Sequence, residues 1–153
     1  MDGEAHLPPA MTGVLPDQVD AAWPLVAGWL EGVVARSRGK ESLAELRAAF
    51  VAGRKQLWIW VPPASAGAGL AAGVQALAVT EIVNYPAAKI CRVCIATGER
   101  RGQWLAPGLA VIEAWAKAQG CDAVEPVARL GWERELKQLG YRAHHMILAK
   151  ELP

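Results

Sequence analysis

The sequence has little of what marks several common classes of protein. Its 153 residues include only three cysteines, one phenylalanine and two tyrosines. A small, odd number of cysteines does not fit a disulfide framework. No apolar run reaches the roughly 18–20 uncharged residues that a membrane helix needs. The start, Met1-Asp2-Gly3-Glu4, lacks the basic and apolar regions of a secretion signal. We therefore predict a cytoplasmic protein without a membrane partner.

An excess of charge of one sign is also absent. Sixteen basic and fifteen acidic side chains leave a formal net charge of +1. This balance gives no electrostatic reason to expect nucleic acid as a partner. Cys91 and Cys94 have CxxC spacing, but alternation along a strand turns them to opposite faces, with Ile95 on the side of Cys91. Because two diverging sulfurs cannot share one metal ion, we predict no metal site.

Apolar residues are plentiful, at 53% of the chain, and seven of them are tryptophans. This content predicts a packed core, and the length fits one domain. We expect most tryptophans to be buried, whereas an exposed subset would indicate a protein interface. Residues 1–16 contain three prolines and no periodic pattern. We interpret them as an extended N-terminal arm that precedes a single domain, residues 17–153.

Hydrophobic spacing predicts the elements of this domain. Apolar residues three or four positions apart predict helices over residues 17–38, 43–52, 104–119 and 132–139. Ser42 and Glu45 fit a capping box at the start of the second helix. Runs of β-branched and aromatic residues predict strands over residues 56–61, 70–83, 89–97, 122–128 and 141–152. The predicted order is α-α-β-β-β-α-β-α-β.

Local motifs in the second half of the chain point to a fold family. They are Ile112-Glu113-Ala114-Trp115-Ala116, Gly120-Cys121, Gly131-Trp132 and Leu139-Gly140-Tyr141. Together with the element order, they resemble the GNAT acyltransferase fold, an α/β (α+β) fold whose mixed, mostly antiparallel sheet is flanked by helices. With Leu57-Trp58, Val79-Thr80-Glu81-Ile82 and Tyr85-Pro86, the set is similar to uncharacterised GNAT-like proteins of phages and prophages. The resemblance covers residues 17–152.

The resemblance implies a site for acetyl-CoA before the helix 104–119. GNAT enzymes hold the pyrophosphate with a Gln/Arg-x-x-Gly-x-Gly/Ala loop, whose backbone N–H groups approach the phosphates. The corresponding cofactor-binding candidates are Gly98, Arg100, Arg101, Gly102 and Gln103. Glu99 stands where the family has Gln or Arg, and Trp104 occupies the second small position, where we expect it to crowd the phosphate. The two arginines either compensate as phosphate partners or are solvated loop residues.

Catalytic residues of the family are only partly present. Many GNAT enzymes have a tyrosine four residues before the turn glycine, which protonates the leaving thiolate. Here that position holds Leu136, which has no proton to donate. Tyr141, at the usual aromatic position, is a candidate that either acts or packs. Glu81 is the candidate general base for an amine, and its alternative role is a structural ion pair with Arg92.

Two functional hypotheses follow. Loss of the small loop residue and of the tyrosine favours a catalytically degenerate GNAT-like domain, a structural or interaction component of a phage particle or its assembly. Its partners would be other protein subunits or further copies of itself, in the host cytoplasm or on the virion. The alternative is an acyl-CoA-dependent N-acetyltransferase that holds the CoA pyrophosphate with residues 98–103. Binding of acetyl-CoA and the absence of any cofactor are equally compatible with the sequence.

Overall fold

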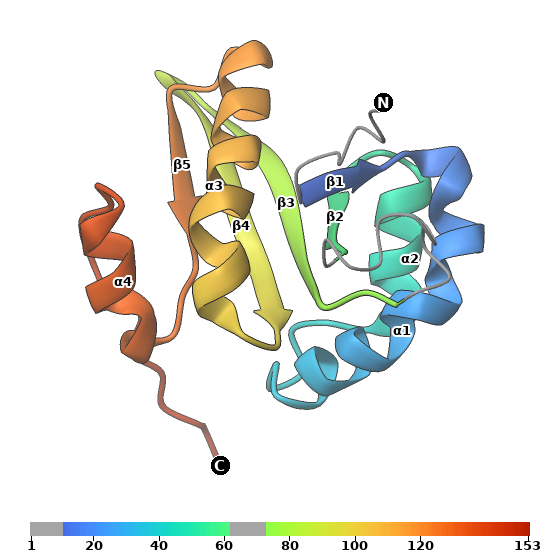
Figure 1. Ribbon diagram of the computed structural model, residues 1–153. Helices are drawn as coiled ribbons and strands as arrows, with labels where there is room; N and C mark the ends of the chain where they lie inside the picture. Colours follow the sequence, from blue (N-terminus) through green and yellow to red (C-terminus); the bar gives the residue numbers. More distant parts are fainter. Residues whose placement is uncertain (1–10, 62–72) are drawn as a thin grey trace, which may run out of the picture.

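A sheet forms the centre of the molecule. The computed structural model describes residues 11–61 and 73–153, and all element counts here refer to these residues (Figure 1). Five strands lie side by side in chain order: β1 Met11–Val14, β2 Gln56–Trp60, β3 Ala76–Tyr85, β4 Ala88–Gly98 and β5 Ala123–Pro126. Neighbouring strands are antiparallel except β4 and β5, which are parallel. The predicted mixed, mostly antiparallel sheet is therefore confirmed.

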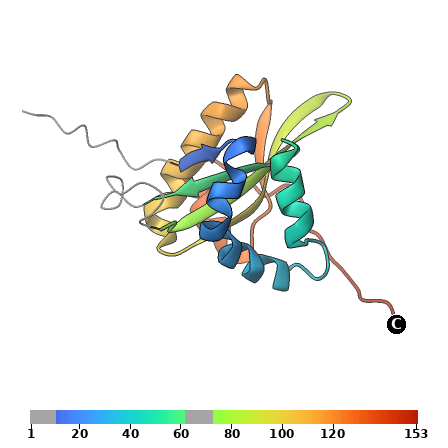
Figure 2. The same ribbon diagram turned by 90° about the vertical axis from the view of Figure 1, so that its right-hand side faces the viewer.

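Helices cover both faces of this sheet. They are the 3-10 helix η1 Pro16–Gln18, α1 Val19–Ala35, α2 Leu43–Val51, α3 Arg101–Ala118, the 3-10 helix η3 Leu130–Trp132, and α4 Glu133–Gln138. Helices α1 and α2 pack on one face and α3 on the other, as Figures 1 and 2 show together. We call these the α1/α2 face and the α3 face. Among the described residues, none of the helices has the length and apolar character to cross a membrane.

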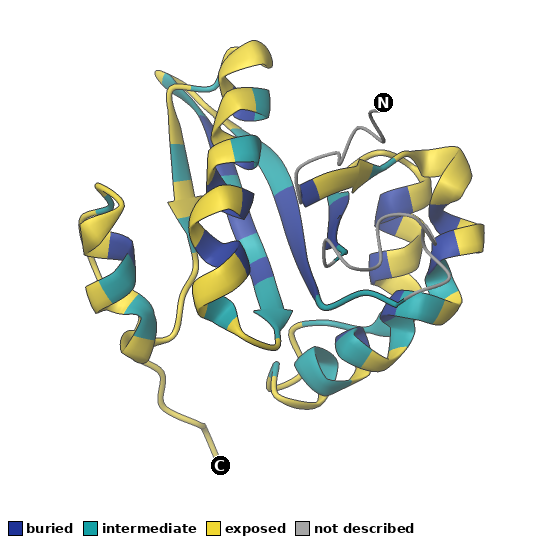
Figure 3. Ribbon diagram, viewed as in Figure 1, coloured by how far each residue is buried: buried dark blue, intermediate teal, exposed yellow. Residues whose placement is uncertain are grey.

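Two hydrophobic clusters hold the layers together, and they follow from the alternation of side chains along the strands. The cluster on the α3 face includes Trp58, Ala78, Cys91, Val93, Trp104, Leu109 and Ile112. The cluster on the α1/α2 face includes Val26, Leu30, Phe50, Leu57, Leu77, Val79 and Ile95. Each central strand contributes to both clusters, which is why buried residues run through the middle of the molecule in Figure 3.

A β-bulge interrupts the pairing of β3 with β4. Val79 pairs with Ile95 and Thr80 with Val93, so Cys94 is an extra residue on β4. Cys94 and Ile95 consequently both pack on the α1/α2 face, and the predicted strict alternation is wrong from this point. Cys91 lies in the cluster on the opposite face, as the CxxC spacing on a strand predicts.

The N-terminal strand lies within the range that the sequence predicts to be an extended arm. Met11 is buried and pairs with Trp60, and the pairing continues to Val14 opposite Leu57. Four residues are too short a run to give a strand signal of their own, and the pairing with β2 makes them a strand. The rest of the predicted arm, residues 1–10, and the predicted strand start at residues 70–72 lie outside the described residues.

The predicted last strand, residues 141–152, does not form. These residues have no regular secondary structure, and nearly all are exposed. The chain end leads away from the sheet in both Figures 1 and 2, so no neighbouring strand supplies hydrogen bonds to it. The observed order of helices and strands is therefore β-α-α-β-β-β-α-β-α.

Candidate functional site

The strands β4 and β5 part in the middle of β4. Their pairing runs from Ile90 opposite Ala123 to Val93 opposite Pro126. One further hydrogen bond joins the N–H of Val127 to the carbonyl of Val93, at 2.9 Å. Beyond this point β4 continues without β5. Cys94, the bulge residue, therefore has no residue opposite it in the register of either β3 or β5.

The amino end of α3 begins just after β4 ends. Arg100 precedes the helix in a left-handed conformation (φ 55°), and the helix begins at Arg101, three residues earlier than predicted. Gly102 and Gln103 are therefore in the first helical turn. The N–H groups of a first turn lack partners inside the helix and favour anions, although here the N–H of Gln103 already donates to the carbonyl of Arg100 at 2.9 Å. A Cβ atom on Gly102 would meet no atom within 4 Å, so the backbone is open to a ligand here.

Gly98 is required by packing rather than by a ligand. A Cβ atom at this position would lie 2.3 Å from Cβ of Ala76 and 2.7 Å from the carbonyl oxygen of Gln75. The next residue, Glu99, donates its N–H to the same carbonyl oxygen at 3.0 Å. The end of β4 is thus held tightly against the start of β3.

Trp104 does not crowd the opening, and the expectation that it would is wrong. Its side chain is only 2% exposed and belongs to the cluster on the α3 face. The indole N–H donates to the carbonyl oxygen of Glu99 at 2.8 Å, and the ring packs edge-to-face on Trp132. Because α3 starts early, position 104 falls on the inward side of the helix. Trp104 thus packs between the loop before α3 and the core on the α3 face.

Arg101 is partly exposed, and its side chain is paired with an acidic residue of α4. Its Nη2 and Nε donate to one carboxylate oxygen of Glu135 at 2.6 and 3.0 Å, and its guanidinium lies 4.7 Å from the ring centre of Trp132. The hydrogen bond holds the pKa of Glu135 below its usual range. Arg101 therefore links the amino end of α3 to α4.

Gln103 and Arg100, the other two polar candidates at the start of α3, differ in whether their side chains form hydrogen bonds. Gln103 accepts a hydrogen bond from the Gln75 amide at 3.3 Å. Arg100 is exposed, and its side chain makes no hydrogen bond or ion pair with other described residues. Of the two arginines, Arg100 is thus the one whose side chain has no polar partner among the described residues.

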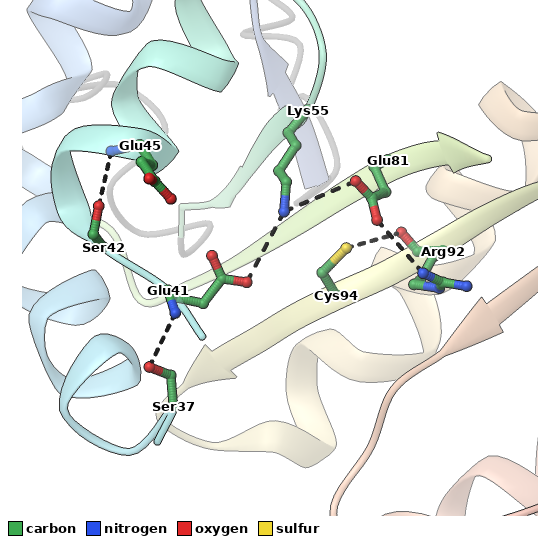
Figure 4. Close-up of polar contacts among 8 residues, drawn as sticks. All are labelled: Ser37, Glu41, Ser42, Glu45, Lys55, Glu81, Arg92 and Cys94. Atoms are coloured by element: carbon green, nitrogen blue, oxygen red, sulfur yellow. Dashed lines mark hydrogen bonds and ion pairs between the residues drawn. The ribbon is translucent and has the colours of Figure 1, made fainter. Parts of the chain in front are cut away.

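Glu81 lies in a charged cluster on the α1/α2 face, beside the bulge (Figure 4). One of its oxygens is 3.6 Å from Nη1 of Arg92 and the other is 3.9 Å from Nζ of Lys55, which also lies 3.9 Å from Glu41. The predicted pairing of Glu81 with Arg92 is confirmed. Neighbouring Cys94 has its pKa raised to about 11, mainly by burial and next by the charge of Glu81.

Tyr141 lies on the opposite side of the sheet. It packs against the cluster on the α3 face, which includes the buried Leu136. Its hydroxyl donates to Glu113 at 2.5 Å. Burial and, next, this hydrogen bond raise the pKa of Tyr141. The two catalytic candidates, Glu81 and Tyr141, are therefore not brought together.

Sequence reasoning missed the contributions of Cys94, Lys55 and Glu41. Lys55 and Glu41 lie outside the periodic segments, where a charged residue carries no signal of its contacts.

The rest of the described surface has a hollow but no cluster of metal ligands. A hollow between α1 and α2 is lined by nine residues, four of them alanines, and shares no residue with the sites above. Within residues 11–61 and 73–153, no group of three or more His, Cys, Asp or Glu side chains is placed to hold a metal ion.

Comparison with known proteins supports the fold but finds no sequence relative. No protein-family model and no curated protein matches the chain. Several solved structures do match this chain. A tetramutant protein of Bacillus halodurans is 16% identical, with a TM-score of 0.63 over 93% of this chain and 99% of that one. An aminoglycoside acetyltransferase from an uncultured soil metagenomic sample, solved with trehalose, is 8% identical, with a TM-score of 0.62 over 94% and 95%.

A third similar structure carries a ligand. It is a predicted acetyltransferase from Clostridium acetobutylicum solved with acetyl-CoA, 13% identical, with a TM-score of 0.61 over 92% of this chain and 94% of that one. Identities this low establish the fold alone. The chain has the GNAT-like fold of these acetyltransferases.

Proposed function

We propose that this protein binds acyl-CoA and transfers the acyl group to an amine. One observation carries the proposal: at Cys94 the bulge in β4 coincides with the end of the β4–β5 pairing, next to the carboxylate of Glu81. At this point the two strands part beside the bulge, and a proton acceptor, the carboxylate of Glu81, lies nearby. Acyl-CoA supplies an activated acyl thioester when bound.

The residues at the opening fit the pyrophosphate of such a ligand. The N–H groups of Arg101 and Gly102 at the start of α3, the open backbone at Gly102 and the side chain of Arg100 are suited to an anion. Trp104 leaves this surface clear because it is buried. Glu99 and the engagement of Arg101 with Glu135 oppose tight binding, so we expect an affinity in the micromolar range or weaker, at about −8 kcal/mol or less favourable.

The chain's own residues have distinct roles in this proposal. Glu81 accepts the proton of the attacking amine, and Arg92 and Lys55 orient its carboxylate. Beyond Val93, where β5 no longer pairs with β4, a backbone N–H of β4 donates to the acyl oxygen, on which negative charge develops. Leu136 occupies the place of the family's proton donor, so the proton for the departing sulfur comes from solvent. Tyr141 has no role here because its hydroxyl points to Glu113 on the other face.

Calorimetric titration with acetyl-CoA tests the proposal. We expect binding to the wild type and a loss of at least tenfold in affinity in Gly102→Val, because a branched side chain would cover the backbone of the first turn. Gly28→Val is the matched control: Gly28 is also an exposed helical glycine with no atom within 4 Å of its Cβ position, but it lies on α1. The absence of binding at millimolar acetyl-CoA would refute the proposal.

A second candidate is the catalytically degenerate domain that resembles phage proteins, an interaction component of a particle in the host cytoplasm or on the virion. Two observations favour it: Leu136 in place of a proton donor, and the exposed apolar side chains near the C-terminus. Co-purification with particle proteins, together with no binding of acetyl-CoA, would support this candidate over the first.

A further inference from the structure

The C-terminal segment, residues 142–153, holds large apolar side chains in solvent. Met146, Ile147 and Leu148 are consecutive and 70%, 75% and 85% exposed, and Leu152 is 84% exposed. Contiguous exposed apolar surface marks a site of interaction. The segment also has the strand-forming composition from which the sequence predicts a strand, and it projects from the body in both views (Figures 1 and 2).

The same molecule has an open strand edge. In the described sheet β5 is the outermost strand and pairs only with β4. Asp122 and Val127 also donate to carbonyl groups of β4, at 2.7 and 2.9 Å, so residues 122–127 follow the sheet for about 20 Å. The outer backbone groups of such an edge accept an added strand. Pro126 has no N–H to donate, so an added strand would bond mainly around Val124.

Charge on the two parts is complementary. Residues 122–127 contain Asp122 and Glu125 and no basic residue. The C-terminal segment, residues 142–153, contains Arg142, Lys150 and two histidines against one acidic residue, Glu151. Opposite charges on paired strands stabilise the pairing and select the partner.

We propose that the C-terminal segment of one copy adds as a strand to β5 of a second copy, and that the exchange is reciprocal. The start of the segment is fixed: Tyr141 donates its N–H to Leu136 at 3.0 Å and its hydroxyl to Glu113. From this anchor the chain leads away from its own β5 (Figure 1). A two-fold dimer would cover both apolar segments and both open edges at once. This interface is independent of acyl transfer.

Light scattering across a dilution series tests the dimer. We expect the wild type to be a dimer and the triple variant Met146→Ser, Ile147→Ser, Leu148→Ser to be a monomer with unchanged far-ultraviolet circular dichroism, because these side chains are largely exposed in one copy. The control replaces two similarly apolar exposed residues elsewhere, Leu15→Ser and Val51→Ser, and should remain a dimer.

A second variant tests the edge. Glu125→Lys should weaken the dimer roughly tenfold by placing like charges on the paired strands, whereas Glu31→Lys, on exposed α1 surface, should not. Hydrogen exchange should show protected amides in residues 142–150 of the dimer. A wild type that is monomeric at every concentration, a protected segment within a monomer, or a dimer that survives the triple substitution would each overturn the proposal.

Discussion

Replacing Gly98 by alanine should destabilise the protein strongly. The added methyl would lie 2.3 Å from Cβ and 2.6 Å from Cα of Ala76, and 2.7 Å from the carbonyl oxygen of Gln75. Favourable carbon contacts are about 3.5–4.0 Å long, so β3 and β4 would have to separate by more than about 1 Å. Two of the three atoms are backbone, which cannot rotate away. We expect a loss near the upper end of the range for overpacking, about 3 kcal/mol.

Urea unfolding followed by tryptophan fluorescence measures this loss. With an m-value of about 2 kcal/mol/M, the midpoint should fall by about 1.5 M. The matched control is Gly102→Ala, where no atom lies within 4 Å and alanine favours the helix by up to about 1 kcal/mol. Its midpoint should be unchanged or higher. The reasoning fails if Gly98→Ala unfolds within about 0.5 kcal/mol of the wild type, or if the control loses as much stability.

Three further results should follow. Glu81→Gln should lower kcat about 100-fold or more while the affinity for acetyl-CoA stays constant; an unchanged kcat would exclude a role as base. Glu135→Gln should free Arg101 for the pyrophosphate and tighten acetyl-CoA binding with a steeper salt dependence, and calorimetry that finds equal affinities would contradict this competition. Burial raises the pKa of Cys91 to about 12 and that of Cys94 to about 11, from a usual 9.0. Above pH 9 the unfolded chain therefore loses protons that the folded chain keeps, and the free energy of unfolding should fall by up to about 1.4 kcal/mol per pH unit for each thiol; a flat urea-unfolding profile from pH 9 to 11 would speak against it.

Local chemistry made most of the fold predictable. The capping residue Ser42 accepts the N–H of Glu45 at 3.1 Å, as its spacing predicts. Helices and strands with strong periodicity lie within a few residues of their predicted bounds, because burial of one face fixes both the pattern and the structure. The prediction of a last strand was wrong because a strand needs a partner strand as well as a pattern. Residues 141–152 have strand-forming side chains but pair with none of the described strands within one copy.

The site was less predictable because it depends on pairing between distant segments. Nothing in the residues around Cys94 marks a bulge, since no glycine or proline is there; the bulge is a property of the register between β3 and β4. Glu81 and Arg92 were predicted as a pair, but the approach of Lys55 depends on the tertiary fold. Arg101 was placed at the correct end of the helix, and its partner Glu135 could not be inferred from a separation of 34 residues.

Trp104, which departs from the GNAT loop pattern, and its neighbour Arg101 hold the loop before α3. Trp104 fills the space beneath the loop and packs on Trp132, and Arg101 binds Glu135 over the same ring. These contacts tie the amino end of α3 to α4. Because Trp104 is buried beneath the loop, a tryptophan in place of a small residue does not by itself argue that the capacity to bind a cofactor was lost.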